Sequence, residues 1–70
     1  MSVEKFLAAI RYHESRDDYT AQSKKSSASG AYQFIDATWK GFGGSTSHAK
    51  DATKQEQDEI ATAWDQGNIK

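Results

Sequence analysis

The chain has 70 residues, of which 36% are hydrophobic, and a net charge of −1. This length suits one domain, residues 1–70, with a single core. The balanced charge argues against nucleic-acid binding, which favours a basic surface, and no run of about 20 apolar residues predicts a membrane span. Because the chain has no cysteine and only two histidines, we expect no disulfide, no metal site and no cofactor.

The first predicted element is an amphipathic helix over residues 3–15, with Ser2 as its N-cap. Its apolar stripe consists of Val3, Phe6, Leu7 and Ile10. The next position on the stripe is Glu14, where we expect a carboxyl group partly withdrawn from water and close to the negative end of the helix dipole. Both effects favour the protonated form that a general acid needs. The alternative is a Glu14 that points to solvent, as glutamates in a last helical turn commonly do.

A polar loop is predicted over residues 16–29, with Tyr19 holding it to the core. Gly30 ends this loop. The apolar pattern of residues 31–35, interrupted by Gln33, suits either a short strand or an extended lead-in to the next helix.

The second predicted helix is short and spans residues 37–42. Asp36 is expected to cap its start, and Trp39 is expected to face the core. The pair Gly43-Gly44 should end it, because glycine accepts the left-handed backbone that a helix stop requires.

The last predicted helix follows a second polar loop, residues 45–52. Thr53 and Glu56 form a capping box, in which the two side chains satisfy each other's backbone donors. The helix should end near Gln66, with Gly67 just beyond it. The residues predicted on its inner face are Ile60, Ala61, Ala63 and Trp64. The pattern therefore predicts a mainly α fold of about three helices, with at most a short β-element before the second helix.

Three segments now suggest a family. Glu14-Ser15 is followed by a polar loop, then by SGAYQF at residues 29–34 and by ATW at residues 37–39. In this order they resemble the lytic transglycosylase domains of the goose-lysozyme and soluble-transglycosylase type. The short length, the glycine pair and the closing Gln/Glu-rich helix are most similar to the catalytic domain of resuscitation-promoting factors. The resemblance covers residues 4–66 and implies a minimal lysozyme-like domain that cleaves peptidoglycan.

The resemblance also implies roles for individual residues, with Glu14 as the catalytic acid/base. The implied substrate-binding residues are Ser15, Gly30, Tyr32, Gln33 and Thr38. Gln33 would hydrogen-bond a saccharide, while Tyr32 and Thr38 would contribute the wall and the floor of the cleft. Gly30 would let the backbone approach the sugar, unless it is an ordinary loop glycine.

Two positions depart from the family pattern. Secreted members carry a cysteine just before the catalytic glutamate, paired with one further on; this chain has His13 there, so we expect packing alone to stabilise it. We expect His13 to be an exposed structural residue. The family's Glu-Ser-Gly-Gly is Glu-Ser-Arg-Asp here, so Arg16 and Asp17 can alter the acid or the rim of the cleft.

Glycosidases generally use two carboxylates. The candidate partners of Glu14 are Asp17, Asp18, Asp36 and Asp51, and no sequence rule selects one. A single glutamate can instead protonate the glycosidic oxygen and then take a proton from the sugar's own 6-hydroxyl, which closes an anhydro ring. We predict this lytic transglycosylase reaction at the β-1,4 bond between N-acetylmuramic acid and N-acetylglucosamine. The alternatives are a hydrolytic lysozyme with the same glutamate and a non-catalytic peptidoglycan-binding module. A helix-turn-helix DNA binder is disfavoured by the charge balance.

We expect the partner to be the peptidoglycan glycan strand, with no nucleic acid and no membrane involved. The chain should act as a monomer outside the cell, at the bacterial cell wall, as a secreted or virion-associated protein. No signal peptide is recognisable after Met1, which predicts export by another route or excision from a larger protein. Because the charge is nearly neutral, attraction to the anionic wall is weak, and a partner domain should supply the targeting.

Overall fold

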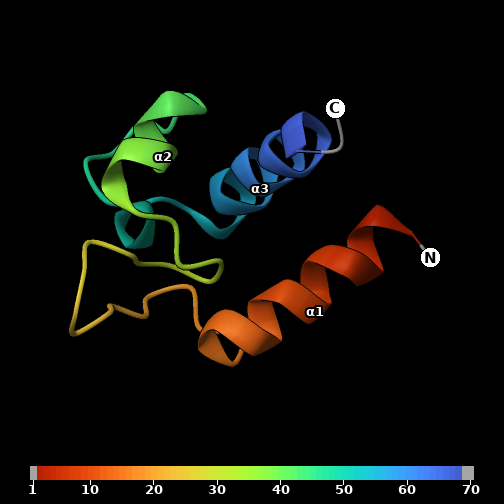
Figure 1. The fold of residues 1–70 in the computed structure, drawn as a ribbon, viewed down its shortest axis with the longest axis horizontal. Coiled ribbons are helices and arrows are strands. Elements are labelled where there is room, and N and C mark those ends of the chain that lie inside the picture. Colours follow the sequence, from red (N-terminus) through yellow and green to blue (C-terminus); the bar gives the residue numbers. More distant parts are fainter. Residues whose placement is uncertain (1, 69–70) are drawn as a thin grey trace.

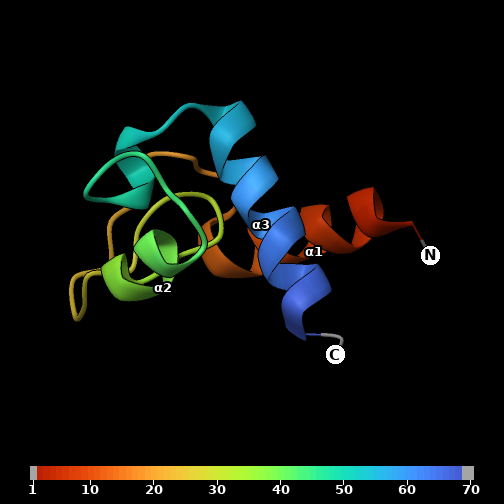
Figure 2. The same ribbon diagram turned by 90° about the horizontal axis from the view of Figure 1, so that it is seen from above.

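The computed structural model describes residues 2–68 of the chain; positions 1, 69 and 70 of the predicted domain lie outside the described residues. Its elements are α1 (Val3–Ser15), α2 (Asp36–Gly41), the 3-10 turn η1 (Ala49–Asp51) and α3 (Lys54–Asn68). In Figure 2, α3 crosses α1, and in Figures 1 and 2 α2 lies at the end of the molecule away from both marked termini. The predicted mainly α fold of three helices is confirmed.

Helix α1 has the predicted boundaries, and its start is capped by Ser2, whose Oγ accepts a hydrogen bond from the Lys5 N–H at 3.1 Å. After the helix, Arg16 and Asp17 have φ values of 59° and 65°. Glycine adopts this left-handed region freely, whereas other residues lose roughly 1 kcal/mol or more there. The Gly-Gly pair of the family motif therefore suits this turn, and Arg16 and Asp17 occupy it here at a cost in backbone energy.

The buried faces of the long helices are narrower than the stripes predict. Leu7 and Ile60 are buried as expected, but Val3 is 46% exposed, Phe6 is 37% exposed and Ala63 is exposed. Figure 2 shows the reason for α1: its N-terminal part extends beyond the helix that crosses it. Periodicity gives the direction of a helix face, while burial requires a neighbouring element that covers it.

Residues 31–35 form neither a strand nor a uniformly extended lead-in. Residues 30–33 are a turn, closed by an isolated antiparallel bridge between Ser29 and Phe34. Two positive φ values, 80° at Gly30 and 55° at Gln33, make the turn tight enough for this bridge. This bridge, with a second one at Gln22, is the only β-structure in residues 2–68.

The turn is held in place by Gln57 of α3, which is only 1% exposed. Its Oε1 accepts a hydrogen bond from the Ala31 N–H at 2.9 Å, and its Nε2 donates to the carbonyls of Tyr19 and Ala52, both at 3.1 Å. A Cβ on Gly30 would lie 2.5 Å from that Oε1, so a side chain there would displace the amide. One buried side chain thus joins α3 to two loops.

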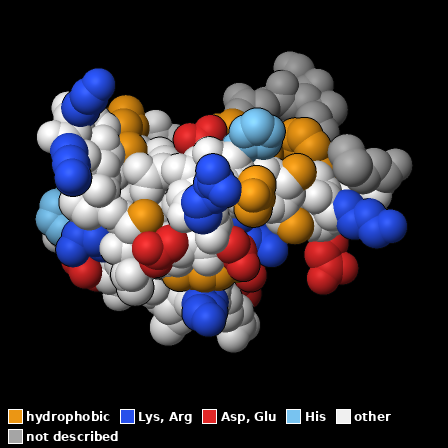
Figure 3. All heavy atoms as spheres, turned by 90° about the horizontal axis from the view of Figure 1, so that it is seen from below, with side chains coloured by type: hydrophobic (Ala, Val, Ile, Leu, Met, Phe, Trp, Pro, Cys, Tyr) orange, Lys and Arg blue, Asp and Glu red, His pale blue; other side chains and the backbone are white. Residues whose placement is uncertain are grey.

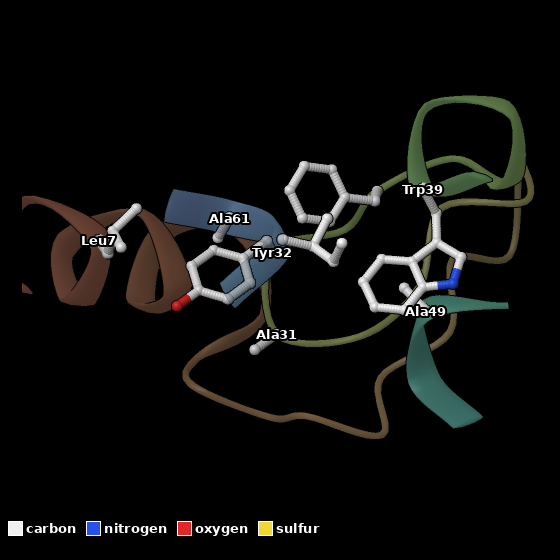
Figure 4. Packing of buried hydrophobic residues seen from close by; sticks show 8 residues of the cluster. Leu7, Ala31, Tyr32, Trp39, Ala49 and Ala61 are labelled. Carbon is white, nitrogen blue, oxygen red and sulfur yellow. The ribbon is translucent and has the colours of Figure 1, made fainter. Parts of the chain in front are cut away.

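Trp39 faces the core as predicted and has no exposed surface. Figure 4 shows its ring beside Ala49 of η1, with the ring of Tyr32 further along the cluster. Phe34 lies between these two aromatic residues, with its centroid 5.8 Å from that of Tyr32 and 6.2 Å from that of Trp39. Gly44 lies against the indole so closely that a Cβ would approach it to 2.2 Å. The glycine after α2 therefore serves packing as well as helix termination.

Three predictions about the ends of α2 and α3 are wrong. Asp36 is the first residue of α2 and not its cap; its carboxylate lies 3.0 Å from Nδ1 of His48. Glu56 donates its N–H to Thr53 Oγ1 as the capping box requires, but its carboxylate accepts hydrogen bonds from the N–H and the hydroxyl of Ser45, both at 2.7 Å. Ser45, in the loop before the helix, therefore takes the place of the Thr53 N–H as the donor to the Glu56 carboxylate. Helix α3 also continues through Gly67.

Candidate active site

A groove of about 270 Å³ lies between the end of α1, the turn before α2, and α3. Its lining residues are Ile10, Glu14, Tyr32, Gln33, Phe34, Ile35, Thr38 and Trp64. Four of the predicted site residues, Glu14, Tyr32, Gln33 and Thr38, are among them. The fold thus brings residues from the first helix, the turn and the second helix to one cavity.

Glu14 lines this groove, and its side chain is exposed. The expectation that it is withdrawn from water is wrong for the free protein. The last turn of α1 continues the apolar face of Ile10, which also lines the groove, but Tyr12, His13 and Glu14 in this turn are all exposed. The carboxylate therefore faces both the cavity and the solvent.

None of the four candidate partner carboxylates lines the groove. Asp17 binds Arg11 Nε at 2.6 Å, Asp18 accepts from Thr20, Asp36 pairs with His48, and Asp51 lies 3.7 Å from Lys50. Glu14 is the only acidic residue among the lining residues. The cavity therefore offers one carboxyl group for acid/base chemistry.

Gln33 has the unusual backbone of the site. Its φ of 55° is uncommon for a residue with a side chain and costs roughly 1 kcal/mol. The side-chain Nε2 donates to the Gly30 carbonyl at 2.9 Å, which fixes the amide across its own turn. One N–H of the amide is used in this way, and the amide oxygen can accept a hydrogen bond from a ligand in the groove.

Tyr32 contributes its ring, not its hydroxyl, to the groove. The residue is 6% exposed, and Figure 4 shows the hydroxyl directed toward α1. That hydroxyl accepts from Arg11 Nη1 at 2.9 Å and donates to Asp58 Oδ1 at 2.7 Å, and Tyr19 donates to the same oxygen at 2.7 Å. Burial and the hydrogen bond to Asp58 raise the pKa of both tyrosines, that of Tyr19 to about 12. The ring of Tyr32 is therefore held rigidly as a wall.

Comparison with known proteins identifies the family of this chain. The profile of the Transglycosylase-like domain family matches residues 2–68. The chain belongs to this family. Membership indicates an enzyme of the glycosidase type that cleaves peptidoglycan and acts at the cell wall. Searches of curated proteins and of solved structures gave no match. The closer likeness to resuscitation-promoting factors stays a prediction.

Two predicted site residues of the transglycosylase-like domain, Ser15 and Gly30, are not among the residues that line the groove. The Ser15 hydroxyl donates to the Ala31 carbonyl at 2.8 Å and accepts from the Asp18 N–H at 3.0 Å. It joins the end of α1 to the turn that carries Gln33. Gly30 is buried at the start of the same turn. Both residues are placed to set the position of the groove residues.

Sequence reasoning missed the apolar wall of the groove, which Ile10, Phe34, Ile35 and Trp64 form. The ring of Trp64 meets that of Phe34 edge-on, with centroids 5.9 Å apart and an angle of 73°. Ile10 could have been assigned from the sequence, because residues four positions apart share a helix face and Ile10 precedes Glu14 by that spacing. Trp64 lies 50 positions from Glu14 in sequence, and no local pattern connects them.

A second, larger groove of about 390 Å³ lies between α1 and α3. Its acidic residues are Glu4 and Asp58. Asp58 lies 3.7 Å from Arg11 and accepts the hydrogen bonds of both tyrosines described above, so its carboxylate is part of the contact between the helices. Glu4 is in the first turn of α1, far along the helix from the family motif. The smaller groove is therefore the candidate site of the transglycosylase-like domain.

The remaining surface adds few features. Seen from the side of α1, acidic and basic side chains are interspersed and no basic stripe for a nucleic acid is visible on this face (Figure 3). Among residues 2–68, no three His, Asp or Glu side chains are grouped so that they could hold a metal ion. In the same part of the chain, no helix combines the length and the apolar character needed to span a bilayer.

Proposed function

We propose that this domain cleaves the β-1,4 bond between N-acetylmuramic acid and N-acetylglucosamine as a lytic transglycosylase, with Glu14 as its single acid/base. One observation carries the proposal: among residues 2–68, Glu14 is the only acidic residue on a groove that it shares with Gln33 and Thr38. The family match supports a peptidoglycan substrate. The lone carboxylate favours an intramolecular reaction over a mechanism that needs a pair.

In the first step, protonated Glu14 gives its proton to the glycosidic oxygen, and the bond from that oxygen to C1 of the muramic acid breaks. The acetamido oxygen of the same sugar stabilises the positive charge that develops at C1. In the second step, the Glu14 carboxylate takes the proton of the 6-hydroxyl, and O6 bonds to C1. The products are a 1,6-anhydro sugar and a free 4-hydroxyl, and no water is consumed.

Because Glu14 is exposed in the free protein, the substrate itself would have to shield its carboxyl group from water. A glycan strand lying in the groove would cover the carboxyl group and displace water from it, so that the proton transfer would take place away from bulk water. The acid would thus be completed only when the sugar is bound. The same exposure, which leaves the carboxylate accessible to water, is the observation that favours the second candidate, a lysozyme that hydrolyses the same bond.

The other site residues would position the substrate and would take no part in proton transfer. Gln33 would accept a hydrogen bond from the substrate through its amide oxygen, and Thr38 would contact the sugar from the groove floor. Tyr32 would form a rigid wall. Ser15 and Gly30 would support the substrate site by holding the turn against the end of α1.

The test compares the wild type with Glu14→Gln on purified cell walls. We expect the variant to lose roughly 100-fold or more of the rate of turbidity loss, because it cannot donate the proton. Glu4→Gln is the matched control, since Glu4 lies on the same helix but on the larger groove, and it should retain the wild-type rate. Equal clearing by wild type and Glu14→Gln would refute the assignment.

Mass spectrometry of the released muropeptides identifies the reaction. Anhydro ends are expected for the transglycosylase. Reducing ends would show hydrolysis and leave Glu14 as the acid of a lysozyme. Binding to the walls without clearing by the wild type would select a non-catalytic module.

A further inference from the structure

The lining of the candidate groove combines two kinds of chemistry. Glu14, Gln33 and Thr38 provide polar atoms, while the other lining residues are apolar or aromatic, and Trp64 has the largest ring among them. Sugar-binding grooves need both kinds of surface, because a pyranose presents hydroxyl groups at its edge and C–H groups on its faces. A few polar groups fix orientation while the apolar lining supplies contact area.

We propose that Trp64 is the platform of this groove: its indole contacts the C–H face or the acetamido methyl of the N-acetylated sugar whose bond Glu14 cleaves. This inference rests on the proposed function and adds a specificity-determining residue to it. Trp64 would act by binding the sugar and would take no part in proton transfer.

The packing of Trp64 supports this role. It is partly buried and lies at the edge of the core, with Phe34 meeting its ring edge-on at 5.9 Å. An edge-on neighbour fixes the plane of the ring, so the indole has little freedom to lose when a sugar binds. A platform of this kind is both apolar and already ordered.

The comparison with Trp39 shows what a purely structural tryptophan looks like in this chain. Trp39 has no exposed surface, and its indole N–H donates to the Thr46 carbonyl at 2.9 Å. On α3 the positions that close the core are Ile60 and Ala61, both buried. Trp64 lies one turn after Ile60, is only partly buried and lines the groove. It therefore differs from the buried core residues of the same helix.

The difference between the two tryptophans also provides the assay. Acrylamide quenches exposed indoles, so quenching of the chain's fluorescence reports on Trp64 and not on Trp39. The protein is the inactive Glu14→Gln variant, and the probe is a tetrasaccharide of alternating N-acetylglucosamine and N-acetylmuramic acid. We expect the saturating saccharide to protect Trp64 and lower the quenching constant.

Affinity is then measured by calorimetry in the same background. Trp64→Ala should raise the Kd of the tetrasaccharide roughly tenfold, and Trp64→Phe should raise it less because part of the aromatic surface remains. Tyr12→Ala removes an exposed aromatic residue of α1 that is not on the groove and should leave the Kd unchanged. In the active protein, Trp64→Phe should raise KM and leave kcat within about twofold, as expected for lost binding that is equal in ground and transition states.

Thermal unfolding shows whether each variant folds, and the quenching measurement needs no substitution at Trp64. Tetrasaccharide binding that leaves both the quenching and the Kd of Trp64→Phe unchanged would overturn the platform while leaving the proposed function intact. If the wild type clears no walls and Glu14→Gln binds no tetrasaccharide, the proposed function fails and the platform with it.

Discussion

Gln57 is the residue whose replacement should test the fold most directly. It is buried, and its amide satisfies three backbone groups: the Ala31 N–H and the carbonyls of Tyr19 and Ala52. Gln57→Leu keeps a side chain of similar size but removes all three hydrogen bonds. We expect it to destabilise the protein strongly, because the three backbone groups would remain buried without partners.

The size of the effect can be estimated from these contacts. Each buried polar group left without a partner costs about 1–3 kcal/mol, and burial of the leucine recovers part of the sum, which gives a net loss of about 3 kcal/mol. Proteins of this length unfold with about 4–10 kcal/mol in total. The loss should lower Tm by about 12–24 °C, since 1 kcal/mol corresponds to about 4–8 °C in a small domain.

Urea and thermal unfolding followed by circular dichroism measure this change. Gln55→Leu is the control, because Gln55 lies on the same helix but is exposed, and its stability should stay within about 0.5 kcal/mol of the wild type. Gln57→Glu separates volume from hydrogen bonding, since it keeps an acceptor for Ala31 but offers no donor to the carbonyls when ionised. If the free energy of unfolding of Gln57→Leu equals that of the wild type, the buried amide does not hold the two loops to α3.

Two further predictions concern backbone conformation and pH. Arg16→Gly should stabilise the protein by about 1 kcal/mol, because Arg16 has a φ of 59° and its side-chain contact with Tyr12 is exposed; an unchanged or lower midpoint in urea would contradict this. The pKa of Tyr19 is raised to about 12 by burial and by its hydrogen bond to Asp58, against about 10 in an unfolded chain, so the native state keeps a proton that the unfolded state releases. Stability from this group is complete below pH 10 and is lost toward pH 12; Tm of Tyr19→Phe should fall less over this window than that of the wild type, and parallel curves would refute the assignment.

The parts of the fold that the sequence predicts are those set by signals within one or two turns of chain. Helix α1 begins and ends where the Ser2 cap and the apolar stripe place it. Trp39 is buried as expected, because a tryptophan in a short helix followed by two glycines has few other places to pack. The Glu-Ser and Gly-x-x-Gln segments predicted a shared cavity, and Glu14 and Gln33 do line one groove.

The parts that the sequence does not predict depend on partners distant in the chain. Gln57 looks like any polar residue of an exposed helix face, yet it lies in the core because its amide meets backbone groups 26 and 38 positions away. The same holds for Asp58, whose oxygen receives hydrogen bonds from Tyr19 and Tyr32. Hydropathy shows whether a side chain is polar, but it does not show whether the fold provides a buried hydrogen-bond donor or acceptor for that side chain.

Glu14 shows the limit of a periodic stripe most clearly. The stripe gave the correct direction, since Glu14 shares its groove with Ile10, but the expected burial did not follow, because Glu14 and its neighbours Tyr12 and His13 in the last turn of α1 are exposed. For an enzyme that acts on a polymer, this openness has a physical advantage. Under the proposed function, a long glycan could not thread into a closed cavity, so its scissile bond would reach Glu14 from the side, and the strand itself would then supply the cover that excludes water. The groove would therefore have to stay open in the free protein. A variant with larger side chains on the apolar wall of the groove would bind the strand less well, even if those side chains shielded the carboxylate from water.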